Sequence, residues 1–385
     1  MILPIRQASR LLLWPMAVCA CHAQSIVDPS VLGNTVKLFD PRPGDRPLEC
    51  SVTPIQPRLN FSFRLQSGYV VRVPMRQYSG PGHAWLMAVR VTPLGGDGKP
   101  IYFAGRAHLP DVPRNNVEVE LGGGYLLGAG RYRVQWMMVD DESRVCRHEW
   151  RLDARLRGSE RLAKVATPPY TIQQFSLRGV PSESRTRDGR PPFRVTILMH
   201  AAPLLPWRTR LGASDQVLLI GSLSALLERL PTHSVRMVVF NLDQQKELYR
   251  RDGFTLDGID DVAQAVGGLE LNVVNYHVLE HPKGHLDLLS DLVNKELQSP
   301  EPSDAVIFLG PATHYLDRPA PIAWDRPAPL FAYFQYRPLA RRNTSPFPDI
   351  VNSTVAALKG RSFTIFTPGD FAKAIAQLER LVSTP

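Results

Sequence analysis

Residues 193–203 constrain the fold of this chain more than any other stretch, with the sequence Phe-Arg-Val-Thr-Ile-Leu-Met-His-Ala-Ala-Pro. A short, nearly continuous apolar run of this kind is typical of a strand buried on both faces of a parallel sheet. A helix-like run at residues 215–230 and a second apolar run at residues 235–240 follow. Strand, loop, helix and strand open a parallel α/β sheet, and ligands bind such sheets where strands end and helices begin. The loop after Met199 is therefore the predicted functional edge.

The alternation continues to the end of the chain. The remaining apolar runs predict strands at residues 269–279, 304–311, 330–336 and 362–366. Helical periodicity predicts helices at residues 285–297, 349–358 and 368–382, the last one capped by Asp370. We therefore expect a C-terminal domain at residues 192–384, with an α/β doubly wound, mostly parallel sheet.

Residues 40–155 have a different pattern of short alternating runs separated by turn residues. This pattern predicts an N-terminal all-β sandwich of immunoglobulin-like type. The stretch from Gly130 to Trp136 resembles the late strands of bacterial immunoglobulin-like and fibronectin-like modules, with Tyr132 packing the corner and Trp136 in the core. Residues 156–191 are rich in proline and charge, which is typical of a linker.

The first 23 residues are typical of a signal peptide. Arg6 and Arg10 precede the apolar residues 11–20, and small residues predict cleavage after Ala23. We therefore expect a bacterial chain exported to the periplasm or the extracellular space. A lipoprotein attached through Cys21 is the alternative. No later stretch approaches 18 uninterrupted apolar residues, so no transmembrane segment is expected after the signal peptide.

The cysteines and the charge narrow the class of protein further. Cys50 and Cys146 remain after removal of the signal peptide, and an even pair in an exported chain predicts a disulfide. The formal net charge of the whole chain is +9. The basic residues are scattered and are not interleaved with stacking aromatic residues, so nucleic-acid binding is not expected.

The C-terminal half resembles the von Willebrand factor A (VWA) domain, of the kind found in secreted bacterial VWA-related proteins. The matching segments are residues 195–199, 235–241, 304–309 and 360–378. The resemblance implies a VWA-like, Rossmann-like sheet that acts in adhesion or protein binding. It also implies a place for a metal-ion-dependent adhesion site directly after the first strand.

The metal-binding residues of that site are replaced in this chain. The family pattern Asp-x-Ser-x-Ser falls on His200, Ala202 and Leu204. An imidazole and two apolar side chains do not offer the oxygen ligands that magnesium requires. We therefore expect a degenerate site with no metal and no cofactor.

The predicted function is non-enzymatic protein binding, with an unknown protein partner in the envelope or the extracellular space. The candidate contact residues are His200, Trp207, Tyr315 and Trp324. No catalytic motif is present, since no Gly-x-Ser-x-Gly elbow or phosphate-binding loop occurs in the sequence.

The alternative is a metal-dependent binder or enzyme. His277, His281 and His285 recur every fourth residue, which on a helix would form one metal-binding face. Pro282 and Gly284 interrupt the run, which favours a loop.

Overall fold

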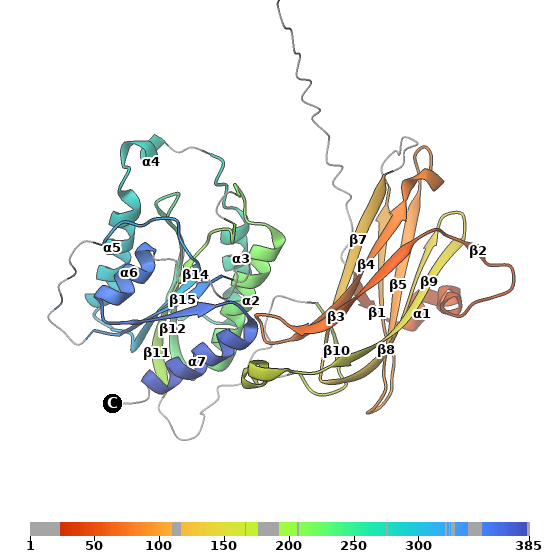
Figure 1. Ribbon diagram of the computed structural model, residues 1–385, viewed down its shortest axis with the longest axis horizontal. Helices are drawn as coiled ribbons and strands as arrows, with labels where there is room; N and C mark the ends of the chain where they lie inside the picture. Colours follow the sequence, from red (N-terminus) through yellow and green to blue (C-terminus); the bar gives the residue numbers. More distant parts are fainter. Residues whose placement is uncertain are drawn as a thin grey trace, which may run out of the picture.

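The computed structural model describes residues 24–109, 117–165, 167–175, 192–205, 208–273, 276–319, 322, 324, 328–337 and 349–382. They form three sheets in two bodies, which lie side by side in Figure 1. The predicted signal peptide and most of the second half of the predicted linker lie outside these residues. No described helix has both the length and the apolarity needed to cross a lipid bilayer.

The first two sheets come from the N-terminal part of the chain. Their strands are β1 (Ser25–Val27), β2 (Arg46–Pro47), β3 (Ser51–Leu59), β4 (Leu65–Pro74), β5 (Ala84–Pro93), β6 (Ile101–His108), β7 (Glu118–Leu127), β8 (Gly130–Asp140), β9 (Arg144–Ala154) and β10 (Ile172–Gln174). One sheet has the order β1-β6-β5-β8-β9-β2 and the other has the order β10-β7-β4-β3. Alternate side chains of the two sheets meet in one core that includes Val71, Val89 and Tyr125.

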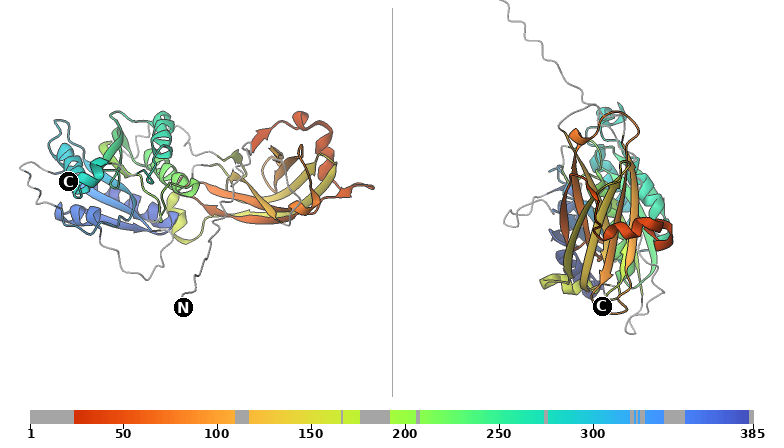
Figure 2. Two further views of the ribbon diagram at one scale, coloured as in Figure 1. Left: turned by 90° about the horizontal axis from the view of Figure 1, so that it is seen from above. Right: turned by 90° about the vertical axis from the view of Figure 1, so that its right-hand side faces the viewer.

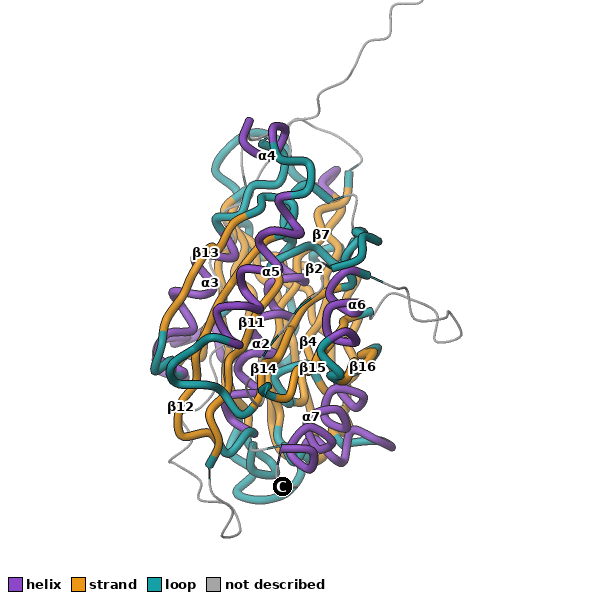
Figure 3. Tube along the Cα trace, turned by 90° about the vertical axis from the view of Figure 1, so that its left-hand side faces the viewer, coloured by secondary structure: helices purple, strands orange, loops and turns teal. Residues whose placement is uncertain are grey.

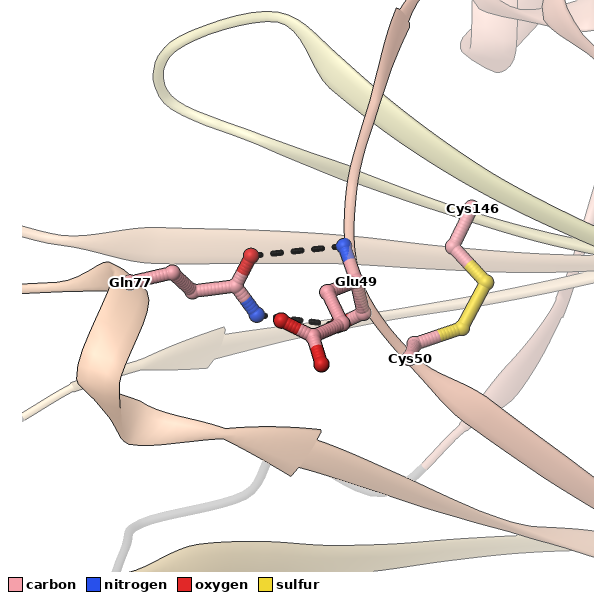
Figure 4. Close-up of a disulfide and its surroundings, with 4 residues drawn as sticks. All are labelled: Glu49, Cys50, Gln77 and Cys146. Carbon is pink, nitrogen blue, oxygen red and sulfur yellow. Dashed lines mark hydrogen bonds between the residues drawn. A yellow bond between two sulfur atoms is a disulfide. The ribbon is translucent and has the colours of Figure 1, made fainter. Parts of the chain in front are cut away.

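Two predicted features of this part are confirmed. The Tyr132 hydroxyl donates to the Gly128 carbonyl at 2.8 Å and to the Thr171 carbonyl at 3.2 Å, and Trp136 is buried in the core. Cys50 and Cys146 form a disulfide with a Cα–Cα distance of 6.3 Å (Figure 4). Cys50 directly precedes β3 and Cys146 lies in β9, so the bond ties the two sheets together.

The third sheet carries the predicted functional edge. Its strands are β11 (Phe193–His200), β12 (Thr232–Asn241), β13 (Lys246–Arg251), β14 (Ala305–Pro311), β15 (Leu330–Tyr336) and β16 (Arg361–Ile365), in the order β13-β12-β11-β14-β15-β16. β13 is antiparallel to β12, and the other neighbours are parallel.

Helices cover both faces of the third sheet (Figure 3). The core on one face joins the sheet to α2 (Ala213–Arg229), α3 (Ile259–Gly267) and α7 (Pro368–Val382). The core on the other face joins it to α5 (Gly284–Leu297) and α6 (Ile350–Ala357). Ile197 of β11 faces the first core and Leu198 faces the second, which explains why most of this strand is apolar.

The turn between β3 and β4 joins the two bodies. Leu59 and Phe63 belong to the core of the third sheet, and the ring of Phe63 lies 5.4 Å from that of Phe371 in α7. Arg64 and Glu228 of α2 form a buried ion pair at 2.8 Å. Figure 2 shows the β3–β4 end of the N-terminal body against the helices of the C-terminal body.

The fold class predicted from the sequence is wrong as stated. Antiparallel pairing predominates among the described strands, with eight of the thirteen pairings, and the third sheet is itself mixed. The N-terminal part is not all-β: α1 (Pro29–Leu32) and the 3-10 helix η1 (Gly33–Phe39) precede the predicted sandwich and pack on its sheet, and the 3-10 helix η2 (Met75–Gln77) lies within it. The expected split into a sandwich and a separate doubly wound sheet is also absent in the described residues, because the β3–β4 turn completes the core of the third sheet.

The mixed character of the third sheet has a local cause. Residues 242–245 connect β12 to β13, and the Gln245 N–H donates to the Leu242 carbonyl at 3.2 Å. A connection this short makes a hairpin, whereas a parallel crossover needs about a dozen residues or more. The polar segment that forms β13 also lacks the apolar pattern that predicts a strand.

Two further predictions are corrected. The described residues of the predicted strand at 269–279 do not form one: Glu270 makes an isolated bridge with Arg210, residues 271–272 lie in a turn, and residues 276–279 belong to the short helix α4 (Tyr276–Glu280). Short apolar runs fit either type of structure, which is why the sequence misled here. Asp370 is the third residue of α7 and not its cap. It accepts from the Thr367 N–H at 2.9 Å, and its own N–H donates to the Thr367 hydroxyl at 3.2 Å.

Candidate functional site

The carboxyl ends of β11, β12 and β14 lie at one edge of the third sheet, here called the loop edge, because neighbouring parallel strands end together. Asn241 at the end of β12 is buried and holds two of its loops. Its amide donates to the Ala201 carbonyl at 2.7 Å and accepts from the Gln244 N–H at 2.7 Å. Asp215, the third residue of α2, accepts from the Gly212 and Leu204 N–H groups at 2.8 and 3.2 Å. The loops of this edge are therefore held by side-chain to backbone hydrogen bonds.

His200 ends β11 and is buried. Its ring stacks on Phe240 with the centroids 5.3 Å apart, and Nε2 accepts from the Leu242 N–H at 3.4 Å. Burial lowers the pKa of His200 to about 4, and the nearby Asp243 carboxylate opposes the shift. Histidine at this position is thus neutral at physiological pH and carries its proton on Nδ1.

A small pocket of about 200 Å³, lined by both polar and apolar residues, lies next to His200 at the loop edge. Asp243 in its wall accepts from the Tyr315 hydroxyl at 2.9 Å and lies 3.6 Å from His314 Nε2. Burial, together with the Asp243 charge, raises the pKa of Tyr315, so the phenol stays protonated and donates to Asp243. The Asp243 carboxylate is therefore held by Tyr315 and lies close to His314, both from the loop after β14.

Three rings stack beside this pocket. Tyr315 stacks on His285 at 4.0 Å between centroids and contacts His314 at 4.1 Å. His285 Nε2 lies 3.0 Å from an Asp317 carboxylate oxygen. These contacts fix the loop after β14 against the start of α5.

Asp349, which directly precedes α6, also holds the loop after β14. Its carboxylate accepts from the Thr313 N–H at 3.1 Å, the Tyr333 hydroxyl at 3.1 Å, the Gln335 amide at 2.8 Å and the Asn352 N–H at 2.7 Å. Burial raises the pKa of Asp349 and these donors oppose the shift. The arrangement caps α6 and satisfies a buried carboxylate, so it is structural.

Exposed apolar side chains gather at the loop edge. Four of the five large hydrophobic residues that are exposed in the described part of residues 193–382 are Val273, Tyr276, Leu279 and Leu316, at 53%, 72%, 64% and 61% exposure. The first three lie on or beside α4, and Leu316 follows the stacked Tyr315. The predicted strand at residues 269–279 concealed the first three. A helical pattern that begins after Asn275 was the signal available.

The contact residues predicted from the sequence are less exposed than these four side chains, where the structure describes them. His200 is buried, and Tyr315 is half-buried in the ring stack. Trp324 is partly buried against the core shared with α5 and α6. Trp207 lies outside the described residues. Contact of any of them with a partner stays a prediction.

The three positions at which the sequence pattern predicts a degenerate metal site, His200, Ala202 and Leu204, lie at a packed strand end. Ala202 is buried, and the backbone N–H of Leu204 is held by Asp215. A side chain at Gly310 would place its Cβ 2.9 Å from His200 Cβ, so β14 approaches His200 closely. Within the described residues, no three His, Cys, Asp or Glu side chains come together as a metal site.

The three histidines of the alternative hypothesis are not on one helix. His277 lies in α4, and its side chain is outside the described part of the structure. His281 lies between α4 and α5, where its carbonyl accepts from the Gly284 N–H at 2.9 Å and the Gln245 amide at 2.8 Å. His285 is buried in the first turn of α5, in the ring stack.

Comparison with known proteins gives no family. No family model matches the chain, and no curated protein matches it. Among solved structures, the chain is similar to a structural-genomics target called SoR45, with 16% identity and a TM-score of 0.19 over 30% of this chain and 95% of that chain. It is also similar to a Bordetella pertussis protein described as ApaA, with 18% identity and a TM-score of 0.19 over 29% of this chain and 99% of that one. Likenesses at this level carry no argument about function.

Proposed function

We propose that this chain is a non-enzymatic protein-binding module that contacts its partner through the loop edge without a metal ion. The observation that carries the proposal is the group of exposed apolar side chains at that edge: Val273, Tyr276, Leu279 and Leu316. Exposed apolar side chains that lie on neighbouring loops are available for contact with a partner, and aromatic residues often dominate the binding energy of protein interfaces. The stacked rings and the buried Asn241 support the surface by keeping its loops in place.

The proposal includes export from a bacterial cell and a distant relation of residues 192–384 to VWA-related secreted proteins. The disulfide supports export, because such bonds persist in oxidising compartments. The relation to the VWA family rests on the hydrophobic sequence pattern alone.

The test compares two double variants as bait in the envelope fraction of the native cell. Tyr276→Ser/Leu279→Ser removes two exposed side chains of the loop edge. Leu162→Ser/Leu381→Ser is the matched control, because Leu162 and Leu381 are also exposed, at 52% and 41%, and lie on other elements.

We expect a partner that binds wild type and the control and binds the loop-edge variant roughly 30-fold more weakly, which corresponds to about 2 kcal/mol. Quantitative mass spectrometry of the captured proteins identifies the partner, and titration of the purified pair measures the affinity. Equal affinity of the partner for both double variants would contradict a contact at the loop edge.

A further inference from the structure

The outer face of the first sheet carries a pocket that the proposed function does not use. α1 and η1 cross this face (Figure 2, right) and form a small core with it that includes Leu32, Phe39 and Tyr102. β1 pairs with the edge of β6, with Ser25 opposite Ala104. A pocket of about 420 Å³ lies between this N-terminal segment and strands β5 and β6. We call it the outer-face pocket.

Its size is that of a ligand site. Pockets that bind small molecules typically measure about 300–1,000 Å³ and are mostly apolar with a few polar groups. The outer-face pocket falls within this range, whereas the pocket at the loop edge, at about 200 Å³, falls below it.

One wall of the outer-face pocket is apolar. Val27, Val31 and Leu32 come from the N-terminal segment, and Leu86 and Ala104 come from β5 and β6. Val31 is 74% exposed. An isolated exposed valine is ordinary, but here it borders a concave apolar wall, so burial by an apolar chain would remove both surfaces from water.

The other side of the pocket is basic. Arg106 and His108 alternate along β6 and point to the same outer face as Ala104. Both are exposed, and neither forms an ion pair with any acidic side chain in the described part of the chain. Leu86 lies opposite Arg106 in the β5–β6 register, which brings the cation to the boundary of the apolar wall. The apolar wall and the unpaired Arg106 guanidinium are therefore adjacent.

We propose that the outer-face pocket binds a free long-chain carboxylate. The alkyl chain lies along Val31, Leu32 and Leu86, and the carboxylate pairs with the Arg106 guanidinium, with His108 beside it. Arg offers a planar donor pair that matches a carboxylate. The neighbouring apolar wall excludes water from one side of the ion pair, which strengthens it relative to a pair in open solvent.

Chain length tests the apolar half of the proposal. Isothermal titration uses sodium dodecanoate, decanoate, octanoate and acetate, each below its micelle concentration. Affinity is expected to rise roughly fourfold for each methylene group that enters the pocket, and acetate is expected not to bind. The neutral 1-dodecanol is expected to bind at least tenfold more weakly than dodecanoate.

Two substitutions test the location. Arg106→Glu should weaken dodecanoate at least tenfold through charge reversal, and Val31→Asp should do so by placing a charge on the wall. Arg131→Glu is the control, because Arg131 is also exposed and lies on β8 of the same sheet, near the Pro93 end of β5, whereas His108 lies opposite Ala84 at the other end. All three positions are on the surface, so the melting temperature should change little.

Three outcomes would overturn the proposal: affinity that does not depend on chain length, unchanged affinity in Arg106→Glu, or binding to phosphatidylglycerol vesicles without binding to free dodecanoate. The last outcome would make this face a membrane-contact surface and not a pocket for a free ligand. None of these outcomes bears on partner binding at the loop edge, which the loop-edge variant tests separately.

Discussion

The burial of His200 determines the chemistry of the residue that ends β11. The ring packs on Phe240 and accepts from the Leu242 N–H, so its role in this chain is packing and loop support. Burial holds the pKa of His200 near 4, well below its usual value of about 6.5. The neutral ring therefore couples folding to pH.

The sign of this coupling follows from proton uptake. Between pH 6.5 and 4 the unfolded chain binds a proton at His200 that the folded chain does not, so stability falls as the pH falls through this range. The full shift corresponds to about 3 kcal/mol. His200→Gln keeps a neutral hydrogen-bonding side chain and should lose less stability between pH 7 and pH 4.5 than the wild type does. Urea denaturation at both values measures the difference, and identical losses would show that His200 is not buried as described. Asp349, whose raised pKa acts in the opposite sense, is the same in both proteins.

At the scale of elements, the sequence predicts the strands and helices that have a continuous hydrophobic pattern. The apolar run of β11, the strands β14 and β15, and the helices α2, α5 and α7 follow from hydrophobic periodicity. The disulfide follows from an even pair of cysteines. The elements that the sequence does not reveal are polar or short: β13 is a charged edge strand, and α4 has five residues. Since three of the four exposed apolar side chains of the loop edge lie on or beside α4, the error in one element concealed most of the candidate contact surface.

The candidate site was less predictable than the fold for a physical reason. The hydrophobic pattern of the sequence shows where the strands end, and this predicts the position of His200 and of the loops. Whether Tyr315 and Trp324 are exposed depends on contacts with His285 and with the α5–α6 core, which come from distant parts of the chain. Sequence periodicity carries no information about such contacts.

The disulfide gives a prediction at the same scale. Cys50 and Cys146 are separated by 96 residues in the sequence, and the chain-entropy model assigns about 4–5 kcal/mol to closing a loop of this length. Cys50→Ser/Cys146→Ser should lower the free energy of unfolding by up to this amount. The N-terminal sheets should unfold first, because the bond joins those two sheets. Denaturation of wild type with and without reductant, compared with the double variant, measures the effect; a variant as stable as the oxidised wild type would contradict it.

At the scale of the whole molecule, the buried ion pair Arg64–Glu228 connects the two bodies. Arg64→Met leaves Glu228 buried without its partner and should destabilise the protein by about 3–5 kcal/mol. Arg64→Met/Glu228→Leu removes both charges and should recover most of that loss, because a buried pair replaced by apolar side chains is often close to neutral. Thermal and urea unfolding of the three proteins measure the stability. If the double variant were as unstable as the single one, the pair itself, rather than the unpaired charge, would determine the loss.

The same interface has a consequence for the order in which the chain is made. Leu59 and Phe63 leave the ribosome well before α2 and α7, the helices that they pack between. The N-terminal hairpin can thus act as a template for the later helices, whereas a fragment that begins at β11 would have to fold with a hole in its core. Because synthesis begins at the N-terminus, Leu59 and Phe63 are already present when the C-terminal core forms.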